Sequence, residues 1–430
     1  MKQEQNQPKV SVVVPIWNPG SAISRCIASL QNQTLKDIEI LFVDDRGTDG
    51  AMELVRAAAE QDPRIRILQN PENMGAGVSR NAGIEAARGE YLSFVDSDDY
   101  VNEVFLERLY QKAISENLDI VKGRSVYILE DGTQTDHVEL NDKIRRGRTA
   151  SVALYRLFTY QHHSALYRRA LLEAYGIRYG ESRRAQDTTF LLKVCHRATR
   201  FDLEESARYF FCENMSSLMH DTRPHTMQRT LDGLREKTDY ILEQMPDDPD
   251  VVPYLKVLYD YLIQLGYSFA QREEHREAVK AFREKLREQM LRMPELPRLK
   301  KQSIPVRVLL EEDRLLPRLP FKLPWDKYAA ADFLPLTKDW CDELKAHPED
   351  RNAFRKQIEK LFFVAGEAVK RLPDAQQRRD VANGLRQQER RLPLTWRVHM
   401  VFSRVAREAF KRCPEGVKRC LRQAIQSLKK

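Results

Sequence analysis

The residues that first suggest chemistry form an acidic cluster, Asp96-Ser97-Asp98-Asp99, directly after a short apolar run. An Asp-x-Asp pair at the end of a buried strand presents carboxylates to a hard divalent cation, which usually keeps waters and substrate phosphates as its other ligands. The cluster therefore predicts a metal site for a diphosphate. An alternative is that these residues only cap a helix that starts near Val104, because aspartate is favoured at helix starts.

Two other positions can contribute to the same chemistry. Asp44 and Asp45 follow another apolar run, and a carboxylate there can accept the imide N–H of a uracil. The alternative is turn chemistry, with Gly47 supplying the bend. Arg80 lies on a glycine-containing helix and can hold a diphosphate by a charge-assisted bond if that helix borders the site. Otherwise it is an ordinary solvated arginine.

The elements that must position these residues are βαβ units, because short apolar runs alternate with helical patterns in the first third of the chain. The predicted strands are 10–15, 38–44, 65–68 and 91–95, and the predicted helices are 22–33, 52–61 and 75–87. Ligands of such sheets bind beyond the carboxyl ends of the strands. Three polar groups fall there: Pro15-Ile16-Trp17-Asn18, Asp44-Asp45 and the acidic cluster.

The rest of the chain is less regular and then helical. A helix from Val104 and a strand at 120–122 precede an irregular stretch that ends at about residue 220. Residues 227–293 show helical periodicity, residues 294–335 are rich in proline and predict a linker or strap, and the chain is helical again from residue 339.

Composition fits a globular protein of two or three domains, since the chain has 430 residues with 42% hydrophobic and 31% charged content. The net charge of +8 suits nucleic acid, an anionic membrane or a phosphorylated substrate. No zinc spacing or aromatic-basic RNA pattern is present, so we expect no nucleic-acid partner. Six scattered cysteines, a polar N-terminus and no long apolar run predict a cytoplasmic protein, soluble or peripheral to a membrane.

The order of the motifs resembles the family 2 glycosyltransferases of the GT-A fold. That family has a strand ending in Pro-x-Tyr-Asn, a strand ending in Val-Asp-Asp, an Asn-x-Gly…Ala-Arg-Asn-x-Gly helix and a strand ending in Asp-x-Asp-Asp. The corresponding segments here are Pro15 to Asn18, Val43-Asp44-Asp45, Asn73 to Gly83 and Phe94 to Asp99. The resemblance implies a GT-A-type sheet, mixed but mostly parallel and flanked by helices, in an α/β fold followed by a largely helical C-terminal region.

The resemblance also implies a UDP-sugar donor. Asp44, in preference to Asp45, would bind the uracil, with Pro15 and Asn18 lining the same pocket. Arg80 would hold the diphosphate. Asp96 would lie near the ribose, Ser97 would also bind the donor, and Asp98 would ligate Mn²⁺ or Mg²⁺.

A weaker resemblance continues to about His220 and implies an acceptor side. Leu166-Tyr167-Arg168-Arg169, Gln186-Asp187-Thr188-Thr189-Phe190 and the segment from Tyr209 to Ser217 match its elements. An acceptor hydroxyl needs a base, and the resemblance assigns that role to Asp187 in a single inverting displacement. The alternative makes Asp187 the cap of a helix over 188–195. Three residues depart from the family pattern. Trp17 replaces the usual Tyr, Arg46 stands where Gly or Asn is common, and Gln186 replaces Glu.

These observations predict five regions: 1–123 for the sugar nucleotide, 124–224 for the acceptor, a helical region 225–293, a strap 294–338 and a basic helical region 339–430. The predicted function is metal-assisted transfer from a UDP-sugar to a glycan or lipid-linked acceptor in cell-surface polysaccharide or glycan biosynthesis. The alternative is a silent sugar-nucleotide-binding or scaffolding protein. The amphipathic segment 396–412 predicts a packed helix or, in the sharper alternative, contact with the inner face of the plasma membrane.

Overall fold

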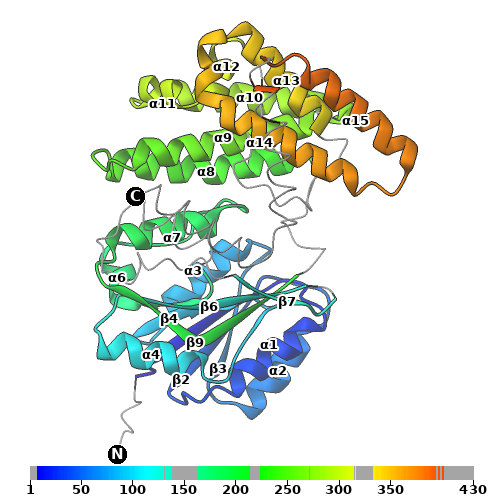
Figure 1. Cartoon of the computed structure of the whole chain (residues 1–430). Coiled ribbons are helices and arrows are strands. Elements are labelled where there is room, and N and C mark those ends of the chain that lie inside the picture. Colours follow the sequence, from blue (N-terminus) through cyan, green and yellow to red (C-terminus); the bar gives the residue numbers. More distant parts are fainter. Residues whose placement is uncertain are drawn as a thin grey trace, which may run out of the picture. The chain divides into compact units, whose positions relative to one another are not determined.

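The computed structural model describes residues 7–129, 131–137, 162–213, 223–270, 272–313, 315, 333–393, 396, 397 and 400. The chain divides into two compact units, residues 1–313 and 314–430. The first unit contains a sheet domain followed by a group of helices, and the second is helical (Figure 1).

The sheet has the strand order β3-β2-β1-β4-β8-β6-β9-β5, with β7 beside β6. Its strands are β1 (Val10–Ile16), β2 (Ile38–Asp44), β3 (Ile65–Gln69), β4 (Tyr91–Phe94), β5 (Tyr100–Val101), β6 (Ile120–Ile128), β7 (Gln134–His137), β8 (Ala165–Arg168) and β9 (Phe201–Cys212). Strands β3, β2, β1 and β4, which are neighbours in that order, run parallel to one another. Strand β8 is antiparallel to both of its neighbours, β4 and β6. The sheet is therefore mixed and mostly parallel, which confirms the predicted fold class.

The register of β1 brings the polar groups together. Val13 of β1 lies opposite Leu41 of β2 and Phe94 of β4, so the three strands end at the same edge. Strands β1, β2 and β4 are buried along their whole length, as is typical of parallel strands covered on both faces. Their carboxyl ends are thus the places where the chain can become polar.

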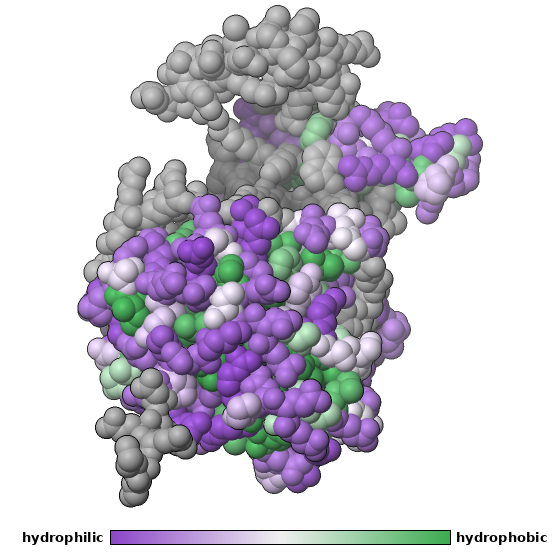
Figure 2. Space-filling model, turned by 90° about the horizontal axis from the view of Figure 1, so that it is seen from below, coloured by the Kyte–Doolittle hydropathy of each residue, from purple (hydrophilic) through white to green (hydrophobic). Residues whose placement is uncertain are grey.

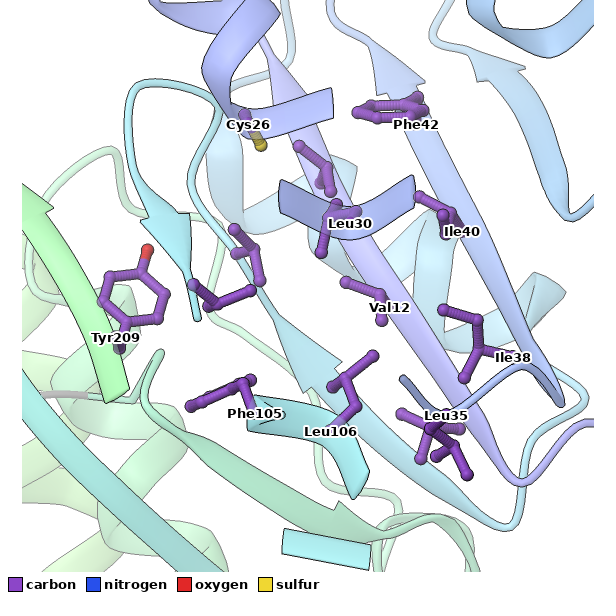
Figure 3. Close-up of a cluster of buried hydrophobic side chains, with 14 of the residues drawn as sticks. Val12, Cys26, Leu30, Leu35, Ile38, Ile40, Phe42, Phe105, Leu106 and Tyr209 are labelled. Atoms are coloured by element: carbon purple, nitrogen blue, oxygen red, sulfur yellow. The ribbon is translucent and has the colours of Figure 1, made fainter. Parts of the chain in front are cut away.

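Helices cover both faces of the sheet. Helices α1 (Ala22–Gln31), α2 (Ala51–Gln61) and α4 (Phe105–Ser115) pack on one face, where the side chains of the core cluster interleave (Figures 1 and 3). In Figure 3, Phe105 of α4 lies beside Tyr209 of β9, and Leu30 of α1 lies near Val12 of β1. The other face carries α3 (Ala76–Ala86), α6 (Arg169–Ala174) and α7 (Gln186–Arg197) (Figure 1).

The stretch predicted to be irregular, from residue 123 to about 220, contains regular elements in its described part. Strand β6 continues to Ile128, and the twelve-residue β9 runs parallel to it with an irregularity between Gly123 and Arg124. Charged residues such as Glu204 and Glu205 interrupt the apolar alternation of β9, which is why its pattern did not predict a strand. The main chain of β9 is nevertheless held by pairing on both sides, with β6 and with β5.

The helices that follow in the first unit are α8 (His225–Gln244), α9 (Val251–Ala270), α10 (Arg276–Leu291), α11 (Leu296–Gln302) and α12 (Ile304–Glu311). Helices α11 and α12 both pack against α9. The prediction of a linker or strap over 294–338 was therefore wrong for 296–311. Pro297 and Pro305 lie in the first turns of these helices, where proline costs no hydrogen bond.

The described part of the second unit is a group of three helices, α13 (Phe333–Ala346), α14 (Arg351–Lys370) and α15 (Ala375–Glu389). Trp340 of α13 is buried and stacks on Phe354 of α14, with ring centroids 5.7 Å apart. The amphipathic segment 396–412, for which a packed helix or a membrane helix was predicted, lies almost entirely outside the described residues. The finer division of the chain into five regions remains a prediction.

The surface seen in Figure 2 is mostly hydrophilic, with hydrophobic residues in small scattered groups. Among the helices that the structure describes, none has both the length and the apolar character needed to cross a bilayer.

Close packing between α3 and the sheet gives a stability prediction. A Cβ added at Gly83 would lie 2.2 Å from Val13 Cγ1, inside a buried strand. Gly83→Ala should lower the free energy of unfolding by about 1–3 kcal/mol, the usual cost of overpacking. Gly366→Ala adds the same methyl group to α14, where no described atom lies within 4 Å, and should not be destabilising. Urea unfolding would measure both, and equal effects would contradict the packing argument.

Candidate active site

The acidic cluster (residues 96–99) follows β4 and is fixed by β9. The Asp99 carboxylate accepts hydrogen bonds from the Tyr209 hydroxyl at 2.7 Å and from the Cys212 N–H at 2.8 Å. The Tyr209 hydroxyl also accepts a bond from the Asp96 N–H at 3.1 Å. Helix α4 begins at Phe105 with no side-chain cap, so the alternative that the cluster caps this helix is wrong.

Asp96, which is partly exposed, forms an ion pair with the buried Arg80. The Arg80 guanidinium, with 6% of its side chain exposed, lies 2.5 Å from Asp96 Oδ1. Burial alone would raise the pKa of Asp96, but Arg80 outweighs it and holds that pKa well below its usual range. Arg80 also lies over the ring of Tyr179, 5.3 Å from its centroid. The structure thus places Arg80 in the site, paired with a carboxylate rather than solvated.

Asp98 and Ser97 are partly exposed beside this pair, and Arg25 donates to the main-chain oxygen of Asp98 at 3.1 Å. Burial raises the pKa of Asp99 well above its usual value, and the negative charges of Asp96 and Asp98 raise it further. Negative charge therefore accumulates at this strand end. A partly exposed carboxylate in such a field fits a hard divalent cation, which would neutralise it.

The carboxylates of Asp44 and Asp45 accept hydrogen bonds from different parts of the chain. Asp44 accepts from the Arg46 N–H at 2.9 Å and from Gln69 Nε2 at 2.7 Å. Asp45 accepts from the N–H groups of Met74 and Gly75, both at 2.8 Å. Asp45 also accepts from Asn70 Nδ2 at 2.7 Å. Asp45 therefore anchors the loop that begins α3, the helix of Arg80.

The loop after β1 approaches the loop after β2. Pro15 is buried opposite Val43, and the Asn18 side chain accepts a bond from the Thr48 N–H at 2.6 Å. A Cβ on Gly47 would meet Asn18 at 2.9 Å, so glycine allows this approach. The bend itself is at Arg46, whose φ of 64° is left-handed, not at Gly47 as the turn alternative assumed. Glycine or asparagine adopts that conformation more readily.

Asp187 lies in the first turn of α7, where the charges of Arg80 and Asp96 both act on its carboxyl group. The helix begins at Gln186, so Asp187 does not cap a helix over 188–195, and that alternative is wrong. Burial raises the pKa of Asp187 above its usual value, against the opposing effect of Arg80. Since 34% of the side chain remains exposed, this carboxylate is accessible from solvent.

Two histidines that the sequence analysis did not select complete the arrangement. His162 Nδ1 lies 4.0 Å from Asp187 Oδ2, and the ring of His163 lies against Tyr209 at 4.3 Å between centroids. Burial lowers the pKa of His162 well below its usual value and that of His163 to about 4, so both are neutral at pH 7. The sequence signal that points to them is that the two histidines are adjacent. In the structure they directly precede β8, which pairs with β4.

The site thus brings together Asp96, Arg80, His162 and Asp187 from four segments: the end of β4, α3, the chain before β8, and α7. Asp44, Asp45, Pro15 and Asn18 lie at the ends of β1 and β2 along the same edge of the sheet. The roles that the resemblance assigned to the individual residues remain predictions.

Comparison with known proteins fits this arrangement. Residues 11–176 match the family model described as Glycosyl transferase family 2. This domain belongs to glycosyltransferase family 2. The match covers every strand end of the donor edge and stops before α7, so Asp187 lies outside it.

Curated relatives of this glycosyltransferase domain include two bacterial proteins. An uncharacterized glycosyltransferase, EpsJ of Bacillus subtilis, is 35% identical over 223 residues, which are 49% of this chain and 63% of EpsJ. Glycosyltransferase GlyG of Streptococcus pneumoniae is 43% identical over 114 residues, 26% of this chain and 38% of GlyG. The chain thus spans less than two thirds of the length of these relatives.

A solved structure shows the fold. The crystal structure of Staphylococcus aureus TarS 1-349 in complex with UDP-GlcNAc is 22% identical to this chain and has a TM-score of 0.50. The similarity covers 71% of this chain and 91% of that one. The glycosyltransferase domain described here therefore has the GT-A-type fold that the motifs predicted.

The Asp45 anchor gives a second stability prediction. In Asp45→Asn, the buried amide group cannot accept from all three donors, so at least one loses its partner. The free energy of unfolding should fall by about 1–3 kcal/mol, measured by urea titration. Asp49→Asn is the matched control, because Asp49 also accepts two main-chain N–H bonds but is exposed, so water can replace them. A control as unstable as Asp45→Asn would show that burial is not the cause.

Proposed function

We propose that this protein is an inverting glycosyltransferase that moves a sugar from a UDP-sugar to a hydroxyl of a glycan or lipid-linked acceptor, assisted by Mn²⁺ or Mg²⁺. The observation that carries the proposal is the Arg80–Asp96 ion pair at the cluster of strand-end carboxylates, whose two charges both act on the accessible Asp187. Its role would be in cell-surface polysaccharide or glycan synthesis.

The donor side binds and orients the sugar nucleotide in this proposal. Asp44 accepts the uracil N–H, with Pro15 and Asn18 along the same pocket, and Asp96 and Ser97 lie near the ribose. Arg80 adds positive charge next to the diphosphate. A divalent ion ligated by Asp98 would stabilise the charge on the departing diphosphate. The UDP-GlcNAc complex of TarS, a protein with the same fold, supports this choice of donor class.

The acceptor side supplies the base. Inverting transfer needs one group that removes the proton of the acceptor hydroxyl as the new bond forms. Asp187 is suited to this because its raised pKa makes it a better proton acceptor than an ordinary aspartate, while its exposed oxygen remains within reach of an acceptor. His162, neutral and buried beside it, does not compete for the proton at neutral pH.

The metal and donor roles can be tested together. Asp98→Ala should lower kcat with a UDP-sugar by roughly 10²–10³-fold, the loss typical when electrostatic stabilisation of a leaving group is removed. A chelator should abolish turnover of the parent, and Mn²⁺ or Mg²⁺ should restore it. Asp37→Ala removes an exposed carboxylate elsewhere and should leave turnover unchanged. In the same series, Asp44→Ala should bind UDP more weakly by calorimetry. Full activity in chelator would contradict the metal assignment.

The base assignment has its own test. Asp187→Asn should keep the affinity for UDP, because Asp187 lies on the acceptor side, while turnover falls by roughly 10²–10⁴-fold. The anomeric configuration of the product, read by NMR, should be opposite to that of the donor. Normal turnover in the variant, or retention of configuration, would overturn the proposed base. A parent protein that binds UDP but never transfers sugar would instead favour a binding or scaffolding role.

A further inference from the structure

Helix α8, which follows the matched family region, packs tightly against the acceptor side. A Cβ on Gly233 of α8 would lie 2.0 Å from the main-chain oxygen of Arg184, and a Cβ on Gly180 would lie 1.8 Å from Glu236 Oε2. Ser182 also donates to the main-chain oxygen of Arg229 at 3.2 Å. Two glycines thus let α8 contact the 180–185 loop, which leads directly into α7.

Lys237 of α8 is buried at this contact. Only 1% of the residue is exposed. Its ammonium group donates a hydrogen bond to the hydroxyl oxygen of Thr188, which directly follows Asp187 in the chain. Burial lowers the pKa of Lys237 to about 7, while Asp187 and then Glu236 act to keep it charged. The charge of Lys237 acts on Asp187 in turn and lowers the pKa of that carboxyl.

The other charged groups around Asp187 have partners of their own. Arg80 of α3 pairs with Asp96 at the end of β4. Glu236 of α8 pairs with Lys193 of α7 at 2.7 Å. His162, before β8, is neutral at pH 7 because burial and Arg80 lower its pKa. Of the cations that the structure describes, Arg80 and then Lys237 lower the pKa of Asp187, and Lys237 is the one that α8 supplies.

We propose that Lys237 is a positioning residue for Asp187, holding the first turn of α7 through Thr188 and keeping the Asp187 carboxylate ionised. Its role in catalysis rests on the proposed function of Asp187 as the base, whereas the coupling between the two side chains does not. Helix α8 is in this view part of the active site and not only a support for the sheet domain.

The kinetic experiment compares two variants with one control. Lys237→Met removes the charge and the hydrogen bond, and Lys237→Gln removes the charge but can still donate to Thr188. In both, the acidic limb of kcat/KM should move to higher pH, so that the fold-loss of kcat/KM grows as the pH falls and is less than about twofold near pH 9, because removing a positive charge that acts on a carboxyl raises its pKa. UDP affinity should not change.

Lys193→Met is the matched control, since Lys193 lies at the same helix contact and pairs with Glu236 but does not act on Asp187. Its pH profile should match that of the parent. If the Lys237 variants lost kcat/KM by the same factor at every pH, Lys237 would have a purely structural role and the proposal would be overturned. A parent-like profile in Lys237→Gln alone would show that the hydrogen bond matters and the charge does not, which also contradicts it.

A second measurement does not depend on turnover. NMR titration of the Asp187 side-chain carboxyl carbon, assigned with Asp187→Asn, should give a higher midpoint in Lys237→Met than in the parent. In the parent, the same signal should move a second time near pH 7, where Lys237 loses its proton. Absence of both effects overturns the proposal even if the variants fold poorly, because the second step needs no variant. Their presence in a protein without transferase activity would leave the coupling intact and refute only the base assignment.

Discussion

The ion pair between the buried Arg80 and the partly exposed Asp96 is the interaction around which the site is organised. Taking two charges out of water is costly, and such a pair is favourable only when its geometry is good and its neighbours are polar. Here α3 brings the guanidinium to the end of β4, and Tyr179 lies under it. Asp45 fixes the start of that helix, so a carboxylate at one strand end sets the position of an arginine at another.

The same pair separates two electrostatic environments. On the side of the acidic cluster, burial and the charges of Asp96 and Asp98 raise the pKa of Asp99, while Arg80 pairs with Asp96. Around Asp187, the neutral His162 and a partly buried carboxylate form a less charged environment. The proposed transfer, in which a diphosphate leaves on one side while a hydroxyl loses its proton on the other, would use such a division.

The sequence predicted the donor half well because that half depends on local rules. Fully apolar strands, helices between them and polar residues at strand ends can be recognised from short segments, and β1 to β4 lie where they were expected. Histidines 162 and 163 escaped notice because their role comes from antiparallel pairing of β8 with β4, which joins residues more than 70 positions apart. The helices at 296–311 were missed for a different reason: prolines in a first turn were given the weight of helix breakers.

The position of β9 also has a consequence for how the chain folds during synthesis. Strand β5, which directly follows the acidic cluster, pairs with β9 alone among the described strands, and Tyr209 reaches back 110 residues to bind Asp99. Contacts between such distant segments form late, since the chain between them must first be closed into a loop. A nascent chain that has emerged only to residue 200 can complete β1 to β4 and their helices, yet its acidic cluster still lacks the hydroxyl and N–H groups that fix it. The edge of the sheet that carries the strand-end carboxylates would thus form early, and the acidic cluster would become ordered only when β9 pairs with the sheet.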